Sequence, residues 1–260
     1  MVRGLAALAV VAGLAAPAAA QDDPLRSVMW EALRDSYFPG ATVVFDGRVT
    51  VTAPANAENT HAVPVALDAR GLEGVQEVVL IADLNPFPMV LRYHPIEAAP
   101  FVATRIKVQQ ATPVRAAART ADGVWHMGGT LVDAAGGGCS APALAYAEKD
   151  WADHVGEVQA RAWPPGPDGS ARLRLRVRHP QDTGLAPGIP AYFIETLRLR
   201  DGQGREVGRL ETFEPVSENP VFTLELRPGA ARTLKLDGRD NQGGEIGATI
   251  PLPWVQGRAE

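Results

Sequence analysis

Cys139 is the residue best suited to covalent chemistry, and it is the only cysteine among the 260 residues. Three consecutive glycines, Gly136, Gly137 and Gly138, precede it, and Ser140 follows it. A cysteine thiolate acts as nucleophile and as leaving group in disulfide and persulfide exchange. Because glycine has the greatest backbone freedom of any residue, these glycines and Ser140 predict a flexible arm that presents the thiol to another protein. The alternative interpretation is a small buried cysteine in a glycine turn.

Other chemistry has weaker support in the sequence. A thiol enzyme needs a fixed base and a preorganised pocket, and a glycine tether supplies neither, although a histidine could still pair with Cys139 in space. We therefore expect no catalytic residue, no metal ligand and no cofactor. The histidines lack the paired spacing of metal sites and are scattered over His61, His94, His126, His154 and His179.

The first twenty residues have the pattern of a removable secretory signal peptide. A basic Arg3 precedes an apolar run over residues 4–16, and Ala18 and Ala20 provide the small residues of a cleavage site before Gln21. We expect cleavage after Ala20 and a secreted mature protein. No later run approaches the roughly 18 apolar residues that a membrane span requires, so no membrane association is expected.

Charge and cysteine content narrow the expected partners. The formal net charge is −5 and no long basic block occurs, which argues against nucleic acid. A single cysteine cannot form an intramolecular disulfide, so core packing alone must stabilise the protein in an oxidising compartment. An unpaired thiol there is expected to be buried, used, or linked to a second copy, and a Cys139-linked homodimer is one form to expect.

The elements that must position Cys139 are mainly strands. A helix is predicted over residues 23–37, with Asp23 as N-cap and Pro24 at the first helical position, and the hydrophobic period then changes to two. Short β-branched or alternating runs recur between residues 41 and 132 and again between 157 and 250. This pattern predicts an all-β protein of two β-sandwiches. We place the domains at 21–133 and 156–260, with a glycine-rich arm and linker over 134–155.

One predicted strand of the second half carries a row of arginines. Leu173, Leu175 and Val177 alternate with arginines at positions 172, 174, 176 and 178. The alternation predicts one buried face and one positively charged face. A solvated sheet surface is one interpretation of the charged face, and an anion-binding or partner-binding surface is the other.

Several motifs, at matching intervals over nearly all of the predicted mature chain, resemble the sulfur-oxidation carrier pair SoxY and SoxZ. The two are joined here in one chain, as in the SoxYZ-like carriers associated with quinoprotein dehydrogenases. The first half resembles SoxY in residues 53–54, 57–59, 63–65, 85–88 (Asn-Pro-Phe-Pro), 104–106 and 137–139. The second half resembles SoxZ in residues 179–184 (His-Pro-Gln-Asp-Thr-Gly), 189–194, 216–220 (Val-Ser-Glu-Asn-Pro) and 240–241.

The resemblance implies two immunoglobulin-like domains and a periplasmic carrier without turnover of its own. Sulfur intermediates would be attached covalently to Cys139 while partner enzymes process them, with Gly136, Gly137 and Gly138 as the arm. The motifs at residues 85–86 and 179–180 would shape the fold or the domain interface. A quinoprotein dehydrogenase is among the expected partners.

Two departures from the family pattern bear on this hypothesis. The cysteine of a free SoxY subunit lies near the chain end, whereas here the chain continues after Ser140, and a loop anchored at both ends has less reach than a free tail. Gln181 and Asp182 also replace the Met-Glu common in the SoxZ motif. The alternative function is a non-covalent accessory module that docks on a periplasmic quinoprotein dehydrogenase, with Cys139 incidental or linking two copies.

Overall fold

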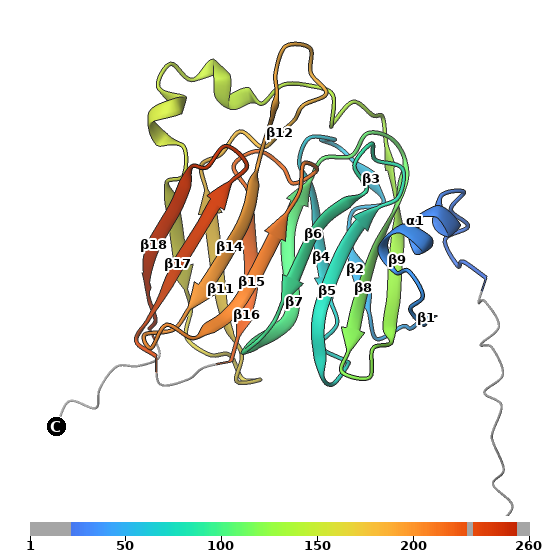
Figure 1. The fold of residues 1–260 in the computed structure, drawn as a ribbon, viewed down its shortest axis with the longest axis horizontal. Coiled ribbons are helices and arrows are strands. Elements are labelled where there is room, and N and C mark those ends of the chain that lie inside the picture. The colour runs from blue at the N-terminus through green and yellow to red at the C-terminus, as the bar shows by residue number, and fades with distance from the viewer. Residues whose placement is uncertain (1–21, 228–230, 254–260) are drawn as a thin grey trace, which may run out of the picture.

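The computed structural model describes residues 22–227 and 231–253, so the predicted signal peptide over residues 1–20 lies outside the described residues. Strands dominate these residues, as the sequence predicts for an all-β protein, and one short α-helix precedes them (Figure 1). None of the helices in the described part of the chain combines the length and the apolar character needed to cross a membrane.

The first half of the chain contributes the helix and the first nine strands. They are α1 (Trp30–Tyr37), β1 (Val43–Phe45), β2 (Thr50–Thr52), β3 (Asn56–Ala57), β4 (Val63–Asp68), β5 (Val75–Ala82), β6 (Met89–His94), β7 (Ala98–Ile106), β8 (Thr112–Thr120) and β9 (Trp125–Ala134).

The second half contributes nine further strands. They are β10 (Val158–Ala162), β11 (Ala171–Val177), β12 (Asp182–Thr183), β13 (Ala191–Tyr192), β14 (Ile194–Arg200), β15 (Glu206–Thr212), β16 (Val221–Leu226), β17 (Thr233–Asp240) and β18 (Glu245–Pro251).

Helix α1 begins later than predicted, because Asp23 has another role. Its carboxylate accepts the backbone N–H groups of Leu25 and Ser27 and forms an ion pair with the buried Arg115 at 2.6 Å. Arg26 has a φ of +49°, which a continuous helix does not allow. Residues 23–29 therefore form turns that attach the N-terminal segment to the sheet, and the helix follows them.

Each half of the chain forms its own sandwich of two sheets. In the first half, β1, β9, β8, β5 and β6 make one sheet and β7, β4 and β2 make the other. In the second half, β15, β14, β17 and β18 make one sheet and β10, β11 and β16 make the other. The segment over residues 41–52, where the predicted strands begin, turns at Asp46 and contributes β1 and β2 to opposite sheets.

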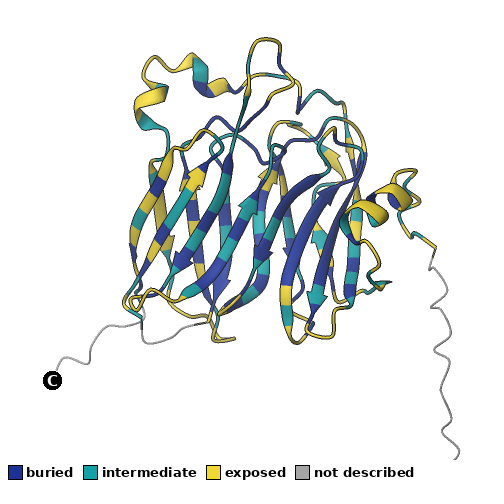
Figure 2. Cartoon of the chain, in the orientation of Figure 1, coloured by how far each residue is buried: buried dark blue, intermediate teal, exposed yellow. Residues whose placement is uncertain are grey.

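The two sandwiches are joined through their edge strands in both sheets (Figure 1). β6 pairs with β15, with Tyr93 opposite Leu210, and β7 pairs with β16, with Val102 opposite Leu224. The same hydrophobic core cluster includes buried residues of both halves, and burial extends along the strands from one sandwich into the other (Figure 2). Both sheets are therefore continuous across the two domains.

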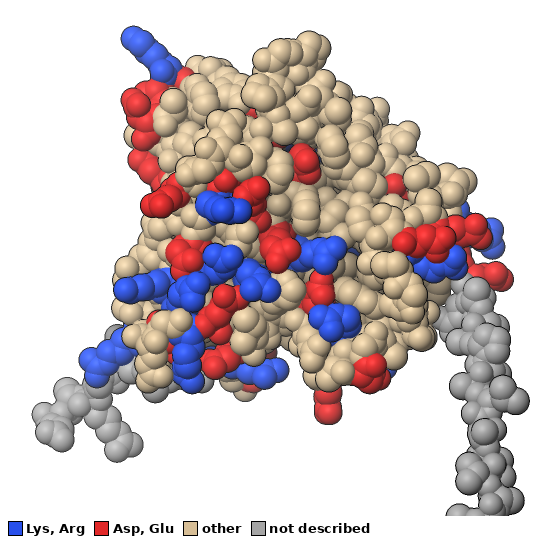
Figure 3. Space-filling view, viewed as in Figure 1, with Lys and Arg blue, Asp and Glu red and all other residues tan. Residues whose placement is uncertain are grey.

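The alternation predicted for the arginine-bearing strand is confirmed. In β11, Leu173, Leu175 and Val177 are fully buried, while Arg172, Arg174 and Arg176 are exposed. β11 pairs with β16, where Phe222 lies opposite Leu175 and is also fully buried. On the opposite face of the molecule, formed by the sheet that contains β14 and β15, charged side chains of both signs lie next to one another (Figure 3).

Phe222→Ala tests how strongly the two sandwiches unfold as one unit. Truncating this buried ring is expected to lower the free energy of unfolding by about 3–5 kcal/mol. Because both sheets are continuous across the junction, urea unfolding followed by circular dichroism should show one transition that moves as a whole. The matched control is Arg174→Ala, an exposed change on the neighbouring strand, expected to shift stability by less than about 0.5 kcal/mol. Two transitions, of which only one moves, would contradict this coupling.

Candidate functional site

Cys139 lies in a segment that crosses from one sandwich to the other. The segment leaves the end of β9, passes over the same end of both sandwiches and enters β10, as the upper part of Figure 1 shows. It contains two short 3₁₀ turns, η1 (Leu144–Ala147) and η2 (Trp151–His154). The chain therefore brings the thiol to the junction between the two domains.

The glycines before Cys139 are hydrogen-bonded to the first domain. Gly136 accepts a hydrogen bond from the Thr60 hydroxyl at 3.1 Å, Gly137 donates to the Gln109 carbonyl at 3.1 Å, and Gly138 donates to the Val108 carbonyl at 3.2 Å. A Cβ atom on Gly138 would lie 2.1 Å from the Thr60 carbonyl oxygen. A side chain there would force the segment off the domain, so glycine permits this close approach.

The thiol itself is buried, with Cys139 only 1% exposed. Its backbone N–H donates to Gln109 Oε1 at 3.1 Å, and its carbonyl accepts a hydrogen bond from the Thr183 hydroxyl of the second domain. The Ser140 hydroxyl lies on the exposed side, 3.3 Å from the Gly137 carbonyl. The structure thus differs from the expectation of a projecting arm with an accessible thiol. The buried alternative describes this conformation, and the role of the glycines and Ser140 as a flexible arm stays a prediction.

Side chains of the second domain hold the residues that follow Cys139. Asp182 accepts the Ala143 N–H at 3.0 Å and the Tyr146 hydroxyl, and Glu218 accepts the Leu144 N–H at 2.6 Å. We call these contacts, together with the Arg178–Glu148 ion pair, the latch. The Tyr146 ring also packs edge-on against Trp151, with ring centroids 4.6 Å apart. The latch and the glycine contacts together hold the segment that contains Cys139 against both domains.

Three of the motifs that carry the family resemblance converge on this segment. From the first, Asn85 donates to the Lys107 carbonyl and accepts the Gln109 N–H, both at 2.8 Å, which shapes the loop beneath Cys139. The second supplies Asp182 and Thr183, and the third supplies Glu218. Asp182, which stands where the SoxZ motif commonly has a glutamate, therefore contacts the cysteine segment directly.

Lys107 and Gln109 are site residues that no motif in the sequence indicated. Lys107 is 3% exposed, and its ammonium donates to the Gln181 carbonyl. Gln181 adopts a φ of +52°, and its side-chain oxygen accepts the Ile194 N–H at 2.7 Å, so its backbone conformation is fixed from two sides. In the sequence, residues 107 and 109 belong to a polar loop after β7 that has no distinguishing pattern. Their closeness to Cys139 arises only where the two domains meet.

Burial dominates the electrostatics of the site. It raises the pKa of the Cys139 thiol from 9.0 to about 11, and the nearby positive charge of Lys107 opposes this rise. Burial also lowers the pKa of Lys107, against the opposing effects of Asp182, Cys139 and Glu218. The pKa of Glu218 is raised, again mainly by burial. In the closed conformation the thiol is therefore neutral at pH 7 and unreactive as a nucleophile.

No histidine is among the hydrogen-bond partners of Cys139 in the described part of the chain. Four histidines lie beside carboxylates instead, in the pairs His94–Glu211, His126–Asp46, His154–Glu157 and His179–Asp240. Within the described ranges, no three potential metal-ligating side chains come together.

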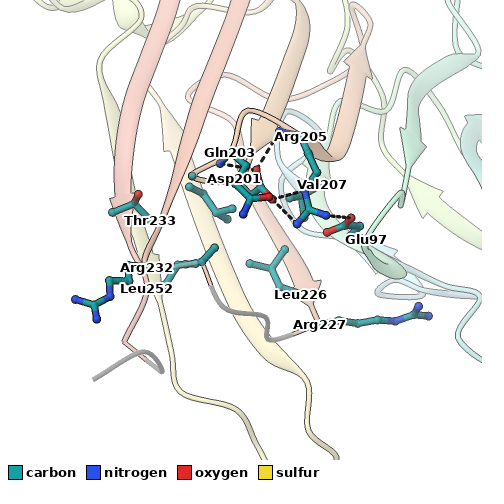
Figure 4. A pocket seen from close by; sticks show the side chains of 13 residues that line it. Glu97, Asp201, Gln203, Arg205, Val207, Leu226, Arg227, Arg232, Thr233 and Leu252 are labelled. Carbon is teal, nitrogen blue, oxygen red and sulfur yellow. Dashed lines mark hydrogen bonds and ion pairs between the residues drawn. The ribbon is translucent and has the colours of Figure 1, made fainter. Parts of the chain in front are cut away.

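Figure 4 shows a pocket that is lined mainly by the second domain, with Glu97 of the first domain at its side. It is formed by the turn after β14 and the ends of β16 and β17. Three of its charged side chains contact one another, since Asp201 accepts two hydrogen bonds from Arg205 at 2.9 Å and Arg205 also lies 3.8 Å from Glu97. This pocket is separate from the cysteine segment.

The fold and this site define a pair of joined immunoglobulin-like domains that enclose one thiol at their junction. Residues 34–139 match the family described as sulfur oxidation protein SoxY, and residues 165–250 match sulphur oxidation protein SoxZ. The chain is thus a SoxY domain fused to a SoxZ domain, and Cys139 is the last residue of the SoxY match.

The solved structures that are similar to the chain include a SoxY protein. The sulfur carrier protein SoxY from Chlorobium limicola f thiosulfatophilum is similar with a TM-score of 0.35 and 17% sequence identity, over 41% of this chain and 96% of that chain. No curated protein matches the chain.

The raised thiol pKa predicts a particular pH dependence of modification. Burial of the neutral thiol stabilises the closed form. This stabilisation is complete at pH values below the ordinary thiol pKa of 9.0, and it is lost as the pH rises towards about 11. The rate of alkylation by iodoacetamide should therefore keep rising by about tenfold per pH unit beyond pH 9. In urea-unfolded protein it should level off near the ordinary value. A plateau near 9.0 in the folded protein would show that the thiol is already solvated.

Weakening the latch should expose the thiol. Tyr146→Phe removes the hydroxyl bonded to Asp182 but keeps the ring against Trp151. A hydrogen bond to a charged acceptor contributes roughly 1.5 kcal/mol or more, so the alkylation rate of Cys139 should rise by about tenfold. Leu144→Ala is the matched control, because that side chain is 80% exposed on the same turn. Equal rates in both variants and the unmodified protein would show that this bond does not restrain the segment.

Proposed function

We propose that the protein is a periplasmic carrier that binds a sulfur-containing, thiol-reactive intermediate covalently on Cys139 and presents it to partner enzymes. The observation that carries the proposal is the position of Cys139. The only cysteine of the chain ends the SoxY match and is held at the junction with the SoxZ domain.

Loading would proceed by exchange at sulfur after the latch opens. The solvated Cys139 thiol loses its proton, and the thiolate attacks a sulfur–sulfur bond on the donor. A new sulfur–sulfur bond forms at Cys139, and the displaced donor sulfur leaves with the electron pair as a thiolate. The proton released by Cys139 goes to that thiolate or to water. The exchange requires no external oxidant, and attack by an acceptor thiolate reverses it.

The chain would act without turnover of its own. The closed conformation supplies the thiol with neither a histidine base nor a solvated thiolate, and exchange of this kind needs only an exposed Cys139. The chemistry on the cargo would belong to partner enzymes, including sulfur-processing or redox enzymes of the periplasm such as a quinoprotein dehydrogenase. The predicted signal peptide supports the compartment.

Burial of Cys139 supports a carrier that must survive between partners. A free exposed thiol in an oxidising compartment is open to oxidation and to linkage with a second copy. The closed segment keeps the thiol neutral and covered until a donor engages it. Because the segment is anchored at both ends, the partner's site must be shallow or must approach the domain junction closely.

Mass spectrometry of the protein isolated from its native host tests the proposal. We expect adducts on the peptide that contains Cys139, released by reductant where a sulfur–sulfur bond forms the linkage. In the variant Cys139→Ser the adducts and the pathway activity should both be lost. A native protein that never carries an adduct, together with an active Cys139→Ser variant, would reject covalent carriage.

The same variant separates carriage from docking. Co-purification with the partner enzyme should survive in Cys139→Ser while pathway activity is lost, because the substitution changes one buried atom and leaves the surface intact. Retention of both binding and activity would instead favour the non-covalent docking module.

A further inference from the structure

Lys107 is a buried cation whose hydrogen-bonding capacity is only partly used. It follows the end of β7 and is 3% exposed. An ammonium has three N–H donors, and the hydrogen bond found for this one within the described residues goes to the Gln181 carbonyl. Removing a charge from water is unfavourable unless partners replace the hydration, so a lysine in this position requires an explanation.

The nearby carboxylates are engaged by other donors. Asp182 accepts Ala143 and Tyr146, and Glu218 accepts Leu144 at 2.6 Å. Both interact with Lys107 through their charge, yet neither forms an ion pair with it within 4.0 Å among the residues described. In the closed site Lys107 is therefore near both carboxylates without being ion-paired to either among the residues described.

Besides these carboxylates, Lys107 interacts electrostatically with His179 and with Cys139, and of the two Cys139 is the one that would carry negative charge. The two side chains interact through their charges, and the backbone also links them, because Lys107 binds the Gln181 carbonyl and Thr183, two residues on, binds the Cys139 carbonyl. A second buried donor belongs to the same stretch, since Gln181 Nε2 has no hydrogen-bond partner in the described part of the chain. Lys107 thus lies between the two stretches that hold Cys139, residues 107–109 and 181–183, with ammonium donors left for an anion.

We propose that Lys107 is a positioning residue for negative charge at Cys139. Its ammonium favours the thiolate as exchange begins, and afterwards favours cargo whose terminal group is anionic over a neutral group of the same size. The inference rests on the proposed function only for the identity of the cargo site. Asp182 and Glu218 act in the opposite direction, so the charge of Lys107 decides how far an anion is tolerated beside them.

Two alkylating reagents of similar size and different charge test the proposal on the full-length protein. Iodoacetate is anionic and iodoacetamide is neutral, and both modify the same thiol. Opening of the latch affects both rates equally, so the ratio of the iodoacetate rate to the iodoacetamide rate reports the charge around Cys139. We expect this ratio to fall by about threefold or more in Lys107→Gln, which removes the charge but keeps a donor for the Gln181 carbonyl.

Matched variants complete the test. Lys107→Arg should restore the ratio, and Lys149→Met, a neutralised exposed lysine on the same segment, should leave it unchanged. Lys107→Met is the second neutral variant, used if circular dichroism shows that Lys107→Gln is not folded. A ratio unchanged in the folded neutral variants would overturn the proposal, as would equal increases in both rates, which would make Lys107 a part of the latch alone.

This measurement is independent of the native cargo. If the ratio falls but no adduct is ever found on Cys139 in the native host, Lys107 positions charge at the thiol and the carrier function fails. If adducts are present and the ratio is unchanged, the carrier function stands and the role of Lys107 fails.

Discussion

The site depends on the pairing of edge strands between the two sandwiches. β6 joins β15 in one sheet and β7 joins β16 in the other, so neither domain can rotate against the other without breaking a ladder. This pairing places the end of β7 beside the start of β16, and Lys107 just after β7 binds the Gln181 carbonyl in the loop before β12. Lys107, Thr183 and Glu218, from distant parts of the sequence, therefore meet around one cysteine. The junction also covers edges that would otherwise be open to pairing with other chains.

The closed cysteine segment covers the Cys139 thiol and at the same time lowers its reactivity. Its restraints come from both domains, with backbone contacts to the glycines on one side and the carboxylates of Asp182 and Glu218 on the other. Each contact is a single hydrogen bond, typically contributing about 1 kcal/mol, or up to roughly 3 kcal/mol where one partner is charged. A partner that binds these carboxylates or the exposed turn around Leu144 could therefore open the segment with a few contacts, without disturbing the continuous sheets.

The sequence indicated most strands because alternation of apolar residues is a local property. Residues 171–178 show this well, since every predicted inward side chain from Leu173 to Val177 is buried. Features that depend on distant partners were not predictable in the same way. The start of α1 moved because the Asp23 carboxylate binds Arg115, ninety-two residues away. The continuity of the sheets was missed because edge pairing between domains leaves no periodic signal in either strand. The domain boundaries at residues 133 and 156 stay predictions.

The glycine run shows why the site was harder to predict than the fold. From the sequence, Gly136, Gly137 and Gly138 indicated freedom, because glycine lacks the side chain that restricts the backbone. In the structure the absent side chain serves close packing, and a Cβ on Gly138 would lie 2.1 Å from a carbonyl oxygen. The two properties are compatible in a carrier. The same residues that pack closely when the segment is closed impose little conformational restriction once it opens. In the proposed carrier, glycine would therefore serve both the covered thiol seen here and a mobile thiol once the latch opens.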